Sequence, residues 1–160
     1  MRVTKPVTTP CLTLAEVKNY LRIDHTADDE YIEDILIPAA QDFVERNTGY
    51  MLSSGTVVIN YDSFDDPEPL PYAPVTSLTS VVDSDGADVT DGFTIDSDTI
   101  SGADGQKVTV SYVAGYTTPP VGFKDLVLTL CAYRYENRGD LAVPVQFLTM
   151  MQRYARLMPL

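Results

Sequence analysis

The chain has 160 residues, of which 44% are hydrophobic and 21% are charged, and its formal net charge is −12 at pH 7. This composition excludes an intrinsically disordered chain and suits one folded domain. It also argues against a protein that binds nucleic acid through its phosphates, because such binding requires clustered lysines and arginines. A surface past which DNA slides without being held is compatible with the negative charge.

We expect neither a secretory signal nor a membrane span. Residues 1–10 lack the apolar core of a signal peptide. The longest uncharged apolar run, residues 126–133, is far shorter than the ~20 residues that a transmembrane helix needs. The two cysteines, Cys11 and Cys131, have no metal-ligand spacing, which favours free thiols in a reducing compartment, although the sequence is also compatible with one disulfide.

Acidic and basic side chains are unevenly distributed along the chain. Residues 51–120 contain one basic and eleven acidic side chains, whereas residues 121–160 contain five basic and three acidic ones. Two poles of opposite charge would favour head-to-tail contact between copies. Aspartates that simply occupy turns would give the same distribution, and the sequence leaves both interpretations open.

The N-terminal part of the chain predicts an arm followed by a helix. Residues 1–11 contain two prolines and several threonines, which is typical of an extended or loose arm. Thr13 and Glu16 have the spacing of a capping box, in which each side chain bonds the backbone amide of the other residue. The apolar face of the helix that begins there is formed by Leu14, Val17 and Leu21.

A longer helix is predicted between Thr26 and Gly49. Its first turn is acidic, as the helix dipole favours, and Gly49 can end it in a left-handed conformation. Pro38 removes one backbone hydrogen bond and should kink the helix near Ile35 and Leu36. The expected apolar face consists of Ile32, Ile35, Leu36, Ala39, Ala40, Phe43 and Val44.

The middle of the chain, about residues 50–115, has the pattern of a small, mostly antiparallel β unit of about four to six strands. Runs of β-branched and aromatic residues alternate there with turn signals such as Asp85-Gly86. Residues 65–71 contain three prolines and are expected to have no regular structure. The predicted strands cover residues 56–61, 75–83, 93–95, 99–100 and 107–113.

Two further helices are expected after the β unit. One is apolar on almost every side from Leu126 to Tyr133, so it should be the buried centre of a bundle, and the other can begin at Pro144. Helices at about 13–49 and 121–158 therefore flank the strands. We predict an α+β fold in one domain of residues 1–160, in which about four helices form a bundle and the β subdomain of residues 50–115 is inserted.

Two groups of side chains near the C-terminus are candidates for contact with other proteins. The charged end of the apolar helix could meet another subunit or could be a solvated last turn. The apolar stripe of the last helix could be core or interface. The first group is Arg134, Glu136, Asn137 and Arg138, and the second is Phe147, Met151 and Tyr154.

No motif in the sequence indicates catalysis or a bound metal. The acids that follow Asp24-His25 are expected from helix capping and the helix dipole. The turn at Asp96-Ser97-Asp98 lacks the spacing of a calcium loop. His25 is the only histidine, and neither a nucleophile motif nor a glycine-rich phosphate loop is present. We predict that the protein is not an enzyme and uses no cofactor and no metal.

Both ends of the chain resemble the head-tail connector (adaptor) proteins of tailed bacteriophages. At the start, the similarity rests on residues 12–25, the acidic run 28–30, the Ala39-Ala40 pair and residues 44–49. At the other end it rests on Tyr135-Glu136-Asn137-Arg138. These short pieces cover roughly half of the chain. Their order and spacing make the similarity specific. The β insertion of about seventy residues is typical of a longer subtype than the all-helical members.

The resemblance implies a structural role in a virion or prophage particle. Copies of the chain would form a ring beneath the portal protein once DNA is packaged, and on the portal they are expected to number about twelve. The ring would extend the DNA channel, through which DNA passes without sequence-specific binding. It would also offer a docking surface to a stopper or tail-completion protein.

The place of action implied by the resemblance is the head-tail interface of the virion, with assembly in the host cytoplasm. The residues alone leave open a cytoplasmic enzyme that depends on His25 and, as the main alternative, a small acidic binding module whose β unit binds a ligand or calcium. Aspartates that converge from the turns between Asp83 and Asp104 would favour this alternative.

Overall fold

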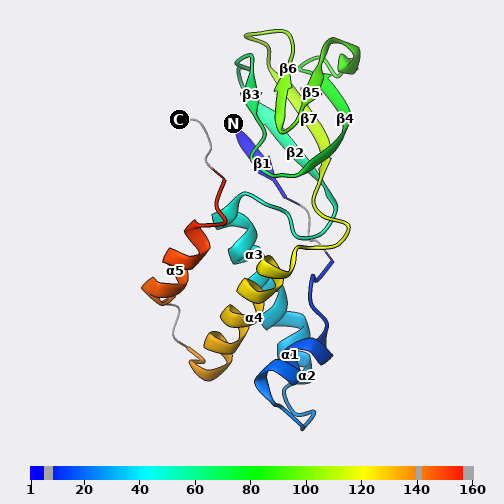
Figure 1. The fold of residues 1–160 in the computed structure, drawn as a ribbon. Helices are drawn as coiled ribbons and strands as arrows, with labels where there is room; N and C mark the ends of the chain where they lie inside the picture. The colour runs from blue at the N-terminus through cyan, green and yellow to red at the C-terminus, as the bar shows by residue number, and fades with distance from the viewer. Residues whose placement is uncertain (6–8, 140–141, 157–160) are drawn as a thin grey trace. The chain divides into compact units, whose positions relative to one another are not determined.

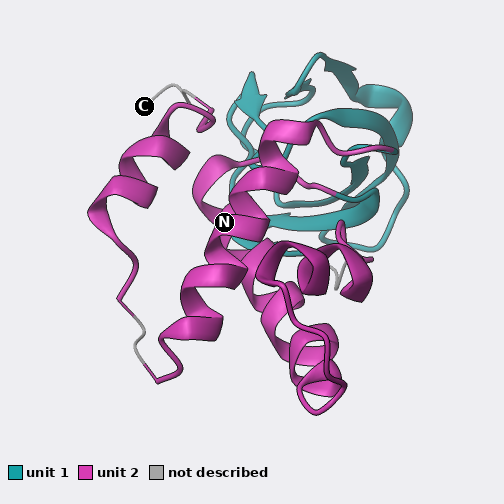
Figure 2. Cartoon of the chain, turned by 60° about the horizontal axis from the view of Figure 1, so that its bottom comes forward, with its two compact units in different colours: residues 1–8, 53–117, 157–160 teal, residues 9–52, 118–156 magenta. Residues whose placement is uncertain are grey.

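The computed structural model describes residues 1–5, 9–139 and 142–156 (Figure 1). The described residues fall into two compact units (Figure 2). The β unit consists of residues 1–5 and 53–117, and the helical unit consists of residues 9–52, 118–139 and 142–156. The predicted α+β fold class is confirmed. None of the described helices is both long and apolar enough to cross a membrane.

Two antiparallel sheets form the β unit, which confirms the predicted antiparallel arrangement. The larger sheet has the order β1-β2-β7-β4 and the smaller one the order β3-β6-β5. A short 3-10 helix, η2 (Thr90–Gly92), precedes β5. The strands are β1 (Arg2–Thr4), β2 (Gly55–Tyr61), β3 (Glu68–Pro69), β4 (Val75–Asp83), β5 (Thr94–Asp96), β6 (Thr99–Ser101) and β7 (Val108–Ala114).

Two sheet edges bear on expectations about the β unit. Residues 2–4 of the arm, which was expected to be extended or loose, are extended and form β1, which pairs with residues 58–60 of β2. The expectation that residues 65–71 have no regular structure was wrong. Within the proline-rich run, Glu68 and Pro69 form β3, which pairs with β6. Because β3 is an edge strand, the nitrogen of Pro69, which has no amide proton, can face away from β6. No hydrogen bond between the strands is then lost.

The core of the β unit follows the alternation that the sequence predicts. The buried side chains of β7 are Val108, Val110, Tyr112 and Ala114, and the residues between them are partly exposed. Phe64 is fully buried and meets the rings of Tyr61 and Phe93 edge-on, at 5.5 and 5.3 Å between centroids. Gly102 lies against Phe93, where any Cβ would be only 2.1 Å from a ring carbon.

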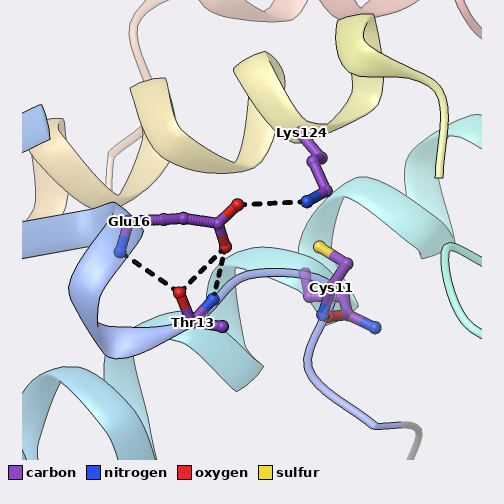
Figure 3. A network of polar contacts seen from close by, with 5 residues as sticks. Cys11, Thr13, Glu16 and Lys124 are labelled. Carbon is purple, nitrogen blue, oxygen red and sulfur yellow. Dashed lines mark hydrogen bonds and ion pairs between the residues drawn. The ribbon is translucent and has the colours of Figure 1, made fainter. Parts of the chain in front are cut away.

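In the helical unit, the first helix begins as its capping box predicts. The Thr13 hydroxyl accepts the Glu16 amide at 3.2 Å, and the Glu16 carboxylate accepts the Thr13 amide at 2.8 Å, before α1 (Leu14–Leu21) (Figure 3). The same carboxylate also lies 3.2 Å from Lys124 Nζ in α4 (Val121–Glu136). One side chain therefore both starts α1 and ties it to α4.

The kink predicted at Pro38 is a π-helical turn, η1 (Ile32–Leu36), between α2 (Asp29–Tyr31) and α3 (Ile37–Thr48). Pro38 has no amide proton, and just before it the Ile37 amide donates to the Ile32 carbonyl five residues back. The extra residue in this turn points Ile35 outward, 58% exposed, and Ile37 inward, 1% exposed. Ile35 was therefore wrongly assigned to the buried face. Gly49 ends α3 in the predicted left-handed conformation.

The helix α4 is the buried centre that the sequence predicts. It contacts α1, η1 and α3, and α5 (Val145–Gln152) begins directly after Pro144, as expected, and contacts α3. In Figure 1, α5 lies on one side of the α3–α4 pair, and α1 and α2 lie on the other side. The buried side chains of α4 are Phe123, Leu126, Val127, Leu130 and Cys131.

Candidate assembly surface

The charged end of α4 is tied to the start of α2. Arg138 Nη2 lies 2.9 Å from Asp28 Oδ2, and the Tyr135 hydroxyl donates to the same oxygen at 2.5 Å. The Arg138 guanidinium also lies over the rings of Tyr31 and Tyr135, at 4.8 and 4.6 Å from their centroids. The Arg138 side chain nevertheless remains 48% exposed. The cluster therefore stabilises the fold and is also accessible at the surface.

These contacts change the pKa values of the groups that make them. The hydrogen bond from the Tyr135 hydroxyl, followed by that from Arg138, lowers the pKa of Asp28. The bond to Asp28 raises the pKa of Tyr135. A carboxyl group whose pKa is lower in the folded state stabilises the fold above its unfolded pKa, about 3.9 for aspartate. That stabilisation is lost as the pH falls through the lowered pKa of the folded state.

The lowered pKa of Asp28 predicts how its contribution to stability depends on pH. Asp28→Asn should lower the melting temperature at neutral pH, and the difference from the wild type should shrink as the pH falls below the unfolded pKa of about 3.9 and Asp28 itself becomes protonated. Thermal unfolding across a pH series measures both effects. Asp24→Asn, at an exposed position in the same loop, is the control. A difference that does not shrink as the pH falls below about 3.9 would contradict the assignment.

The other residues of this candidate group have separate environments. The Arg134 guanidinium lies 5.3 Å from the centre of the Phe43 ring. The Asn137 side-chain amide donates to the Tyr133 carbonyl at 2.9 Å, and Glu136 is exposed. A groove of about 220 Å³ runs between η1 and this end of α4, and Ile35, Leu36, Ala39, Arg134 and Asn137 are among the residues that line it.

The apolar stripe of the last helix faces mainly its own unit. Phe147 and Met151 are only 6% and 3% exposed. Tyr154 is 37% exposed, and its ring lies 5.4 Å from that of Phe123, directly over Gly122. The face of α5 that other proteins can reach is therefore a different one, lined by Val145, Gln146, Thr149, Met150 and Arg153.

Sequence reasoning missed the part that Asp28 plays. The residue was considered only as a helix cap or metal ligand. It does stand at the N-cap position of α2, but its side chain makes no capping bond there. Its partner Tyr135 is 107 residues away, and no local spacing connects the two.

The residues considered for metal binding are not brought together. Among the described residues, no three potential ligands of the types His, Cys, Asp and Glu form a cluster. Asp29 instead pairs with Lys18 at 2.5 Å, and Asp98 accepts the Val75 amide at 2.9 Å within the β unit. The structure thus gives no support to a calcium-binding β unit.

The two cysteines are free and buried. Burial raises the pKa of each thiol to about 12. The Cys11 amide donates to Gln41 Oε1 at 2.7 Å, which fixes the segment that leads into α1. Because only the thiolate is a good nucleophile, both cysteines are expected to be unreactive.

The chain thus consists of a helical unit that is interrupted in sequence by a β unit. Residues 11–85 match the family of phage gp6-like head-tail connector proteins. No curated protein sequence matches the chain. This match, over just under half of the chain, confirms the resemblance to head-tail connector proteins that the sequence indicates. Proteins of the family are structural connectors and not enzymes.

Solved structures with the same fold come from gene transfer agent (GTA) particles. A chain in the virion of the native GTA particle matches with a TM-score of 0.79 and 25% identity. A chain in the neck of the empty particle, computed with C6 symmetry, matches at 0.79 and 24%. A third, in the neck of the native particle computed with C12 symmetry, matches at 0.76 and 24%. Each match covers 100% of this chain and 98% of the other.

Proposed function

We propose that copies of this chain form a ring beneath the portal protein of a phage-like particle. The ring extends the DNA channel and offers a docking surface to the next stopper or tail-completion protein. The observation that carries the proposal is the match over the full chain to neck chains of a particle computed with C12 and C6 symmetry. In such a ring each copy meets its neighbours through two different surfaces.

The charge distribution supports a channel that DNA can pass through. Described residues of the β unit include three basic and eleven acidic side chains. An acidic wall repels the phosphate backbone and so prevents DNA from sticking. The β unit and the helical unit act together as one connector domain, which is assembled in the host cytoplasm and remains at the head-tail interface of the particle.

The candidate residues divide by role in this proposal. The side chains at the end of α4 belong to a surface for a neighbouring subunit or the portal: the half-buried Arg134 and the exposed Glu136, Asn137 and Arg138. Phe147, Met151 and Tyr154 attach α5 to the helical unit. When the ring meets the portal, α5 or the segment after it rearranges.

Light scattering tests the proposal by measuring mass in solution. The protein is measured alone and then after mixing with the portal protein of the same particle. A ring, or a complex with a fixed ratio of connector to portal, is expected. A monomer that does not bind a functional portal would contradict the proposal. Stabilisation of that monomer by calcium would favour a binding module instead.

A further inference from the structure

The exposed face of α5 is an apolar surface with positive charge. Val145 is 73% exposed, and together with Met150 and Arg153 it lines a shallow groove of about 430 Å³. Residues 142–156 contain two arginines and no acidic residue. Within the described part of the chain, no ion pair involves Arg153. This face is therefore suited to an apolar partner surface that carries carboxylates.

A surface of that kind lies at η1, on the other side of the helical unit. Ile35 is 58% exposed there, beside the exposed carboxylates of Glu33 and Asp34. Residues 24–35 contain six acidic residues and no lysine or arginine. Neither Glu33 nor Asp34 forms an ion pair with another described residue. The groove of about 220 Å³ beside Ile35 offers room for an apolar side chain.

The two surfaces are placed so that they meet between copies and not within one copy. The α3–α4 pair lies between α5 and the helices α1 and α2 (Figure 1). Their charges are opposite, which favours contact in one orientation and disfavours contact of either surface with itself. Because the surfaces differ, the contact is heterologous and can continue from copy to copy around a closed ring.

We infer that α5 of one copy docks on η1 of the next copy. Val145 and Met150 cover Ile35 and its groove, and Arg153 lies against Glu33 and Asp34. The inference rests on the proposed ring and adds to it the pair of surfaces that join neighbouring subunits. It also gives a role to the π turn at Pro38, which brings Ile35 to the surface.

Disulfide trapping in the assembled state tests this contact. Val145→Cys and Ile35→Cys are combined in one chain, and each single variant is the matched control. Both positions are exposed, so the fold should tolerate the changes, and melting temperatures check this. The native cysteines are buried at 8% and 0% exposure and should not contribute. Rings of each variant with the portal protein are oxidised, viewed by electron microscopy and run on non-reducing gels.

The expected result is a ladder of covalent oligomers beyond the dimer for the double variant, with monomers for both single variants. Rings that form normally without a ladder would overturn the inference and leave the proposed function standing. Covalent dimers from a single variant would also overturn it, because they would show like surfaces in contact. Failure of the wild type to form rings with the portal would overturn the proposed function and the inference with it.

Discussion

Replacing Phe123 by alanine is expected to lower the free energy of unfolding by about 3–5 kcal/mol. The side chain is 5% exposed, and its ring contacts those of Tyr50 and Tyr154 at 5.4 Å each. It therefore joins α4 to the segment after α3 and to the end of α5. The smaller side chain would leave a cavity among these three elements, which would relax only partly.

Urea unfolding of the wild type and the variant measures this loss. Val121→Ala is the matched control, since Val121 is in the same helix and 81% exposed. It should change the free energy of unfolding by no more than about 0.5 kcal/mol. A loss below about 1 kcal/mol for Phe123→Ala would mean that the aromatic cluster does not hold α5.

The second large effect concerns assembly and not stability. Arg153→Glu should raise the concentration needed for ring formation by about tenfold or more, because like charges that face each other across an interface cost several kcal/mol. The melting temperature should hardly change, since Arg153 is exposed. Light scattering over a concentration series measures the assembly.

A reciprocal change shows whether the effect comes from the proposed pair. Adding Glu33→Arg and Asp34→Arg to Arg153→Glu should restore most of the assembly by exchanging the two signs. Lys107→Glu, an exposed change of the same size in charge, should have little effect. Equal losses for Lys107→Glu and Arg153→Glu would indicate general repulsion between copies and not a specific contact.

The features that the sequence predicted correctly depend on neighbours along the chain. The Thr13–Glu16 capping box acts over three residues, and Gly49 ends a helix through its own backbone conformation. The alternation in β7 needs only a period of two. Each of these signals is complete within one turn or one strand, so no tertiary information was needed.

The features that were missed depend on partners far away or on a choice between similar backbones. Pro38 predicts a distortion of the helix, but the packing of η1 decides whether the helix bends or adopts a π turn. That choice determines whether Ile35 or Ile37 is buried. The link from Asp28 to Tyr135 and Arg138 spans more than a hundred residues. No periodicity can predict such a contact from one sequence.

The proposed function depends on assembly of this chain as a ring on a portal. Electron microscopy of the complex between the two proteins can show this ring. We expect end-on views with twelve equivalent densities, the symmetry applied to the native GTA neck, continuous from one copy to the next. Single copies bound to the portal without mutual contact, or a portal that carries no additional density, would contradict it.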